Sequence, residues 1–145
     1  VGHKNGKYYD TFRNRCMFPI MDLKGRVVAF GGRIMHSEES AAKYLNSPET
    51  VIFNKRRLLF PIYQALPEIR RKRQAIMVEG YMDAISLHAH GIKNVVASLG
   101  TAFTVEQARL LKKYADEVIY SFDMDAAGQN ATRRALEIAG SVGLK

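Results

Sequence analysis

In the second half of the chain, short apolar runs alternate with stretches that carry apolar residues at helical spacing. The apolar runs are 75–78, 94–98 and 117–122, and the helix-like stretches that follow them are 82–90, 105–114 and 127–139. Thr104 and Gln107 form the capping-box pattern at the start of the second stretch. Three successive βα units predict a parallel sheet flanked by helices, with right-handed crossovers.

The first half of the chain has a different pattern. The mainly apolar runs 17–21 and 26–30 flank Asp22–Gly25, which predicts two strands joined by a tight turn. The following Gly31 and Gly32 predict a bulge or a close backbone approach.

Downstream of these glycines the regular pattern weakens. Residues 37–42 are typical of a loop or linker, and 43–50 show no clear strand or helix. Residues 58–66 carry apolar residues at helical spacing, which predicts a short helix that ends before Pro67.

A charged stretch at 68–73 interrupts the apolar rhythm, and we interpret it as the boundary between residues 1–73 and 74–145. The expected fold class is α/β, with the parallel sheet in 74–145 preceded by a small basic α+β subdomain. A further strand is expected after 127–139, so the sequence predicts a piece of a longer polypeptide.

The composition and net charge of the chain indicate which kind of partner it binds. The chain has 145 residues, is 47% hydrophobic and carries 22 Lys and Arg against 14 Asp and Glu, for a net charge of +8. This balance favours a polyanion such as nucleic acid, with acidic lipid as the rival partner. Because no apolar run is long enough to span a membrane and no signal-peptide core is visible, we expect a cytoplasmic protein and no membrane partner.

Cysteine usage also limits the chemistry. The single cysteine, Cys16, excludes an internal disulfide and a multi-cysteine zinc site within these residues. We expect Cys16 to be a small buried residue.

Acidic residues follow two of the predicted strands. Glu79 comes directly after 75–78 and Asp83 falls in the first turn of the next helix, while Asp123 and Asp125 follow 117–122. The carboxyl ends of parallel strands bind ligands, and massed carboxylates repel one another unless a cation neutralises them. Hard oxygen ligands suit Mg²⁺ or Mn²⁺, so the pattern predicts a metal-dependent phosphoryl-transfer centre.

Each acidic cluster has another interpretation. Glu79 and Asp83 also suit simple helix N-terminal acids, and an Asp-x-Asp pair also occurs in helix caps and calcium loops. The calcium-loop interpretation fails because the residues after Asp125 lack the further oxygen ligands and the closing Glu. An aspartyl nucleophile at Asp123 lacks a supporting Thr or Lys nearby.

Basic residues concentrate in the first half, interspersed with aromatic ones. They are Arg13, Arg15, Lys24, Arg26, Arg33, Lys43, Lys55, Arg56 and Arg57. Lys and Arg beside stacking aromatics are typical of grooves for single strands or nucleotides, although a solvated surface charge is the default for each.

Several runs together resemble the catalytic core of bacterial replicative DNA primases. The runs 79–83, 97–101 and 123–128 are similar to the Toprim domain of that family. The upstream runs 12–20, 30–33 and 43–50 resemble the basic subdomain that precedes it.

The resemblance implies synthesis of RNA primers on single-stranded DNA from ribonucleoside triphosphates. It implies that Glu79, Asp123 and Asp125 are catalytic and hold Mg²⁺ or Mn²⁺ with Asp83 close by, with no zinc in this piece. The residues that it implies for nucleotide or template binding are Arg13, Arg33, Lys43, Asn46, Lys55 and Tyr81.

The resemblance also has implications for the whole protein. It places the family's zinc-binding domain, its helicase-binding domain and a further acidic motif outside residues 1–145. The replicative helicase would be a partner through that absent domain at the replisome on the nucleoid, and this piece alone need not make primers. Two alternatives remain open: a Toprim nuclease or topoisomerase fragment, and a nucleic-acid-binding module with an inactive metal site.

Overall fold

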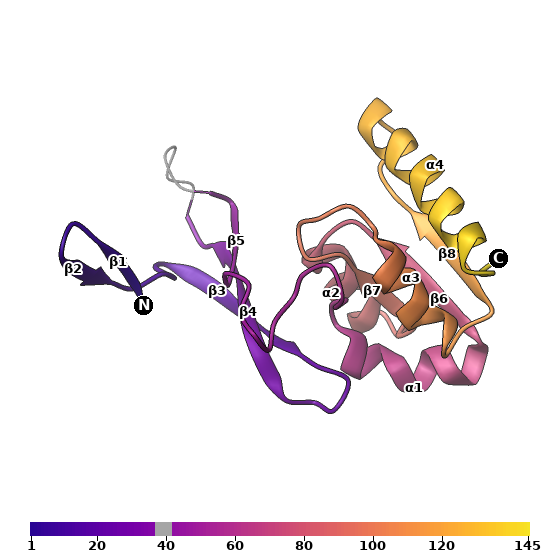
Figure 1. Ribbon diagram of the computed structural model, residues 1–145, viewed down its shortest axis with the longest axis horizontal. Coiled ribbons are helices and arrows are strands. Elements are labelled where there is room, and N and C mark those ends of the chain that lie inside the picture. The colour runs from indigo at the N-terminus through magenta and orange to yellow at the C-terminus, as the bar shows by residue number, and fades with distance from the viewer. Residues whose placement is uncertain (37–41) are drawn as a thin grey trace.

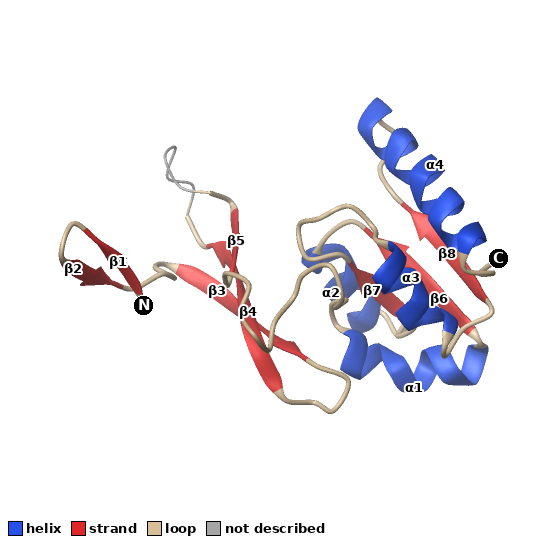
Figure 2. Ribbon diagram, viewed as in Figure 1, coloured by secondary structure: helices blue, strands red, loops and turns tan. Residues whose placement is uncertain are grey.

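The computed structural model describes residues 1–36 and 42–145, and its elements form three parts in a row (Figure 1). A hairpin is followed by a three-stranded sheet and then by a sheet with helices beside it (Figure 2). The strands are β1 (Gly2–Lys4), β2 (Lys7–Tyr9), β3 (Arg15–Met21), β4 (Val27–Ile34), β5 (Tyr44–Asn46), β6 (Gln74–Val78), β7 (Val95–Ala97) and β8 (Glu117–Ser121). The helices are α1 (Ile62–Lys72), α2 (Tyr81–Ala89), α3 (Val105–Lys112) and α4 (Ala126–Ser141).

The predicted pair of strands in the first half is confirmed as β3 and β4, which are antiparallel. Asp22 shapes their turn, since its Oδ1 accepts hydrogen bonds from the backbone N–H groups of Lys24 at 2.8 Å and Arg26 at 3.0 Å. Gly25 has φ +78°, a conformation that side chains rarely adopt. Cys16 on β3 is exposed, so the prediction that it is buried is wrong.

The predicted bulge at Gly31 and Gly32 is wrong, because both residues pair within β4, opposite Phe18 and Met17. The irregularity falls instead between Ile20 and Met21. The alternative expectation, a close approach to the backbone at these glycines, is confirmed at Gly31. A Cβ at Gly31 would lie only 3.0 Å from the ring of Tyr81.

The segment 43–50, where no strand was expected, contains β5. This strand pairs antiparallel with β4, with Tyr44 opposite Arg33 and Asn46 opposite Gly31. A strand of three residues is too short to give a readable alternation of apolar and polar positions. Of the loop predicted at 37–42, only Ala42 lies within the described residues.

The helix predicted to end before Pro67 instead continues to Lys72. Proline inside a helix costs about 3 kcal/mol. The buried face of α1 extends past the proline to Ile69, and fully burying a side chain of this kind contributes about 1.5–3 kcal/mol. Leu66 and Ile69 together therefore offset the proline, and the charged stretch 68–73 falls mainly on the exposed side of this helix.

The parallel sheet of three βα units is confirmed, with strand order β7–β6–β8. Val78 at the end of β6 pairs with Ala97 of β7 and Ser121 of β8, so the carboxyl ends of all three strands lie at one edge. The capping box is also confirmed: Thr104 Oγ1 accepts from the N–H of Gln107, and Gln107 Oε1 accepts from the N–H of Thr104, each at 3.1 Å.

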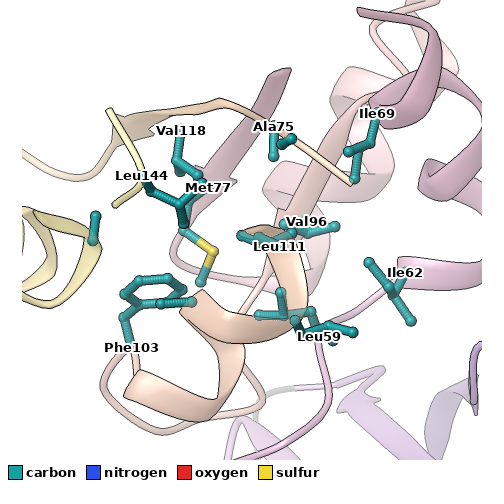
Figure 3. Packing of buried hydrophobic residues seen from close by; sticks show 14 of the residues in the cluster. Leu59, Ile62, Ile69, Ala75, Met77, Val96, Phe103, Leu111, Val118 and Leu144 are labelled. Carbon is teal, nitrogen blue, oxygen red and sulfur yellow. The ribbon is translucent and has the colours of Figure 1, made fainter. Parts of the chain in front are cut away.

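Two hydrophobic clusters hold this part together. Met77 lies in one cluster with Leu111 of α3, and its neighbour Val78 lies in the other with Ala84 of α2, because successive residues of a strand face opposite sides. Figure 3 shows the first cluster, in which Leu59 and residues of α1 pack against residues of the sheet and α3. Residues 59–69 therefore share a core with the second half of the chain, and the division at 73/74 stays a prediction.

None of the helices in 1–36 and 42–145 combines the length and apolar character that crossing a membrane requires.

Candidate metal centre and nucleic-acid interface

Glu79 and Asp123 meet at the carboxyl edge of the sheet. Glu79 directly follows β6, and its Oε1 accepts a hydrogen bond from the backbone N–H of Asp123 at 3.0 Å. Because β6 and β8 are neighbours in the sheet, the two acidic clusters converge in space as the strand pattern predicts. We define the acidic edge as Glu79, Asp83, Asp123 and Asp125, all of which are exposed.

Backbone amides position the other two carboxylates of the acidic edge. Asp125 is the N-cap of α4, and its Oδ1 accepts from the N–H of Gly128 at 2.7 Å. Asp83 lies in the first turn of α2, where its Oδ2 accepts from the N–H of Gly80 at 3.2 Å. The cap role of Asp125 was one of the open alternatives for Asp-x-Asp, and it fixes the carboxylate without removing its charge.

Within 1–36 and 42–145, no three side chains of Asp, Glu, His or Cys gather into a ready-made metal cage. The donor set still fits Mg²⁺ or Mn²⁺, because all four side chains are hard carboxylates with exposed surface. Mg²⁺ in particular is usually held by one or two protein carboxylates, while water and substrate phosphates complete its coordination.

A cavity of about 800 Å³ opens beside the acidic edge. Glu79 and Asp125 contribute charged lining, the loop after β7 contributes Ser98 and Thr101, and α4 contributes Arg134. The buried Thr101 hydroxyl has no hydrogen-bond partner in the part of the chain that the structure describes. The cavity thus combines anionic, cationic and neutral polar groups next to the candidate metal ligands.

The loop after β7 turns tightly at Gly100, which has φ +71°. Arg134 lies further along α4 in no recognisable motif, so its local sequence does not predict a place in the site. The cavity is visible only once α4 is placed beside this loop.

Asn46 and Tyr81, both predicted to serve the binding site, bond to each other. The Tyr81 hydroxyl donates to Asn46 Oδ1, and Asn46 Nδ2 donates to the carbonyl of Leu99 at 3.1 Å. Burial raises the pKa of Tyr81 well above its ordinary value, and the hydrogen bond to Asn46 lowers it only in part. Tyr81 therefore stays protonated, as its donor role requires.

Arg33 lies on the same side of the three-stranded sheet as Tyr44 and Asn46. Arg33 is directly opposite Tyr44 in the register, and alternate residues of β5 share a face. The Tyr44 ring lies 6.3 Å from the ring of Tyr81, so this face is directed toward the start of α2. Arg33 is exposed and can meet a phosphate there.

The remaining predicted binding residues are more spread out. Lys43 is exposed with its Nζ 6.0 Å from the centre of the Tyr44 ring, and Arg13 is exposed with its guanidinium 6.0 Å from that of Tyr9. Such cation–π pairs hold long side chains close to stacking surfaces. Tyr9 ends β2 and Arg13 lies between β2 and β3, whereas Lys43 directly precedes β5.

The backbone carbonyl of Lys55 accepts a hydrogen bond from a side chain of α3, a contact that the sequence did not predict. Gln107 is fully buried, and its Nε2 donates to the carbonyls of Lys55 at 3.1 Å and Leu58 at 2.9 Å. Thr104 Oγ1 donates to the carbonyl of Arg56 at 2.6 Å. The capping-box pattern marks Thr104 and Gln107 as the start of a helix. It does not indicate that their side chains also bind the backbone of residues 55–58.

Comparison with known proteins gives consistent matches along the chain. Residues 1–66 match the family described as DNA primase catalytic core, N-terminal domain, and residues 76–145 match the family described as Toprim-like. A curated DNA primase from Clostridium acetobutylicum is 53% identical over 143 residues, which cover 99% of this chain and 24% of that protein. The chain thus spans about a quarter of that relative.

Solved structures agree with the sequence matches. The Aquifex aeolicus primase, comprising zinc-binding and RNA polymerase domains, is 42% identical with a TM-score of 0.92, over 99% of this chain and 36% of that one. A DnaG primase catalytic domain bound to single-stranded DNA is 45% identical with a TM-score of 0.86, over 96% of this chain and 44% of that one. The Toprim-like sheet and the basic part before it are therefore confirmed as the fold.

Proposed function

Since the chain belongs to the bacterial DNA primase family, we propose that it is part of an enzyme that synthesises RNA primers on single-stranded DNA during replication. The single observation that carries the proposal is the contact between Glu79 and the backbone of Asp123. It brings acidic residues from two neighbouring strands to one edge, next to a basic part of the chain.

In this proposal Glu79, Asp123 and Asp125 hold Mg²⁺ or Mn²⁺, with Asp83 adjacent. When bound, such cations lower the pKa of an attacking hydroxyl and stabilise charge on the phosphates. The exposed carboxylates and their fixed backbone partners support this role, because they present charge without having to reorganise. Mg²⁺ and Mn²⁺ are both compatible with these ligands.

The reaction that we propose is nucleotidyl transfer. The 3′-hydroxyl oxygen of the growing primer bonds to the α-phosphorus of a ribonucleoside triphosphate while the bond to the bridging oxygen of the β-phosphate breaks. Pyrophosphate leaves and the hydroxyl proton passes to water. The protein's own contribution is to hold the primer hydroxyl and the triphosphate at the acidic edge in the orientation that the reaction requires.

The basic part of the chain would neutralise the phosphates of template and nucleotide. Arg33 lies on the face directed toward Tyr81, Lys43 and Arg13 are exposed beside tyrosine rings, and Lys55 is held by Gln107. This arrangement supports a division of labour in which residues 1–73 bind polyanion and 74–145 carry the metal ligands. The replicative helicase remains a proposed partner through a domain outside these residues.

The competing functions predict different behaviour. A Toprim nuclease or topoisomerase fragment would cleave DNA strands, and the match of residues 1–66 to the N-terminal domain of the DNA primase catalytic core favours primer synthesis over both. A binding module with an inactive metal site would bind DNA yet show no metal-linked heat. Calorimetry with Mn²⁺ on the wild type and on Glu79→Gln separates that case.

The direct test is primer synthesis by the primase that contains this chain, with Asp123→Asn and Asp125→Asn introduced singly and together. We expect loss of primer synthesis while single-stranded DNA binding is largely kept. Glu137→Gln is the matched control, because it removes one negative charge from an exposed position of α4 outside the acidic edge. Full activity of the double variant would refute the proposal.

A further inference from the structure

Asn46 joins two loops of the parallel sheet to the three-stranded sheet. Its amide oxygen accepts from the Tyr81 hydroxyl at the start of α2, and its amide nitrogen donates to the carbonyl of Leu99 after β7. The orientation of the amide is determined, because a carbonyl oxygen can only accept and must therefore face the nitrogen. One side chain on β5 thus bonds to the turns that follow both β6 and β7.

Tyr81 packs between Phe18 of β3 and Phe60, whose backbone pairs with Ala97 of β7. It is 4% exposed, and its ring meets Phe60 edge-on at 4.8 Å and stacks on Phe18 at 5.8 Å. The absence of a side chain at Gly31 leaves the room that the ring needs, since a Cβ there would lie 3.0 Å from it. The ring cannot shift without disturbing both sides of this contact.

The position of Tyr81 determines the position of Glu79. Only Gly80 separates them, and Glu79 in turn bonds to the backbone of Asp123. Asn46 also restrains the Gly100 turn, where a Cβ would meet its Nδ2 at 3.3 Å. A chain of contacts therefore runs from β5 through Tyr81 to the acidic edge.

We propose that Asn46 and Tyr81 are positioning residues that fix the basic three-stranded sheet against the acidic edge, and that their mutual hydrogen bond serves turnover, not nucleotide affinity. This inference rests on the proposed primase function and refines it, because both residues had been expected to contact nucleotide or line the site. Each already uses its polar group within the protein. Their effect on the reaction is therefore indirect, through the placement of template and nucleotide relative to Glu79.

The test is a double-mutant cycle in the primase that contains this chain, with Asn46→Ala, Tyr81→Phe and the double variant. We expect each single variant to lower kcat about tenfold or more and to change the KM for ribonucleoside triphosphates less than about twofold. The double variant should lose no more than Asn46→Ala alone, because the two side chains act through one bond. Tyr63→Phe is the control, since Tyr63 lies on α1 at the β3–β4 turn and should leave kcat unchanged.

Other outcomes are decisive as well. A raised KM with unchanged kcat would show direct nucleotide contact and overturn the inference, as would additive losses or an unaltered kcat per folded molecule. Asn46→Leu keeps the approximate size of the side chain but lacks both the acceptor for Tyr81 and the donor to Leu99, so it replaces Asn46→Ala in the cycle if that variant fails to fold. If the wild type makes no primer, the proposed function itself fails, a result distinct from all of these.

Discussion

Gly128→Ala tests how tightly the acidic edge is built. A Cβ at Gly128 would overlap the carbonyl oxygen of Asp123 and lie 2.8 Å from its carbonyl carbon, so the backbone before α4 must move. The same movement strains the bond from Gly128 to Asp125 and the bond from Asp123 to Glu79.

The expected cost can be worked out from these contacts. Overpacking of a fixed site costs about 1–3 kcal/mol, and weakening an N-cap costs about 0.5–2 kcal/mol. Alanine regains about 1 kcal/mol over glycine through its helix propensity. We therefore expect the free energy of unfolding to fall by about 2 kcal/mol, measured by urea denaturation followed by circular dichroism.

Gly140→Ala is the matched control on the same helix. Nothing lies within 4 Å of a Cβ at Gly140, so this variant should gain about 0.5–1 kcal/mol from propensity alone. The two substitutions should therefore shift stability in opposite directions. A Gly128→Ala protein as stable as the wild type, with unaltered Mn²⁺ binding, would show that the loop between β8 and α4 is not constrained as described.

Three further predictions follow from separate features. Gln107→Leu leaves the partly buried carbonyls of Lys55 and Leu58 without their donor, and should cost about 1–3 kcal/mol of unfolding free energy in urea denaturation. The hydrogen bond from Arg71 lowers the pKa of Glu68 from 4.5 to about 2, so its stabilisation is complete above 4.5 and is lost as pH falls toward 2. Glu68→Gln should flatten the thermal-stability profile over that range, and a profile identical to the wild type would contradict the assignment. Binding of single-stranded DNA, followed by fluorescence anisotropy, should weaken steeply with salt because phosphate contacts release counterions, and a flat salt dependence would exclude the basic interface.

The sequence predicts best those helices and strands in which the pattern of apolar residues extends over several positions. The runs at β6 and β8 and the stretches at α2, α3 and α4 were all located to within a few residues, because burial imposes a repeat on several successive positions. The convergence of Glu79 with Asp123 followed from parallel topology alone.

The features that were missed depend on contacts between distant residues. Pro67 stays inside α1 because the burial of Leu66 and Ile69 together offsets its cost, and a rule based on local sequence does not include that tertiary contribution. Asn46 and Tyr81 were singled out as site residues, yet their mutual bond joins positions 35 residues apart. Nothing in either local sequence indicates that partnership.

The most direct test of the account is the location of Mn²⁺ by anomalous diffraction in crystals of the catalytic core that contains this chain. We predict an anomalous peak within coordination distance of carboxylate oxygens of Glu79 and of Asp123 or Asp125, and its loss in the Asp123→Asn, Asp125→Asn double variant. Mn²⁺ bound elsewhere, or no peak at the acidic edge at concentrations that support primer synthesis, would contradict the assignment of these carboxylates as the metal ligands.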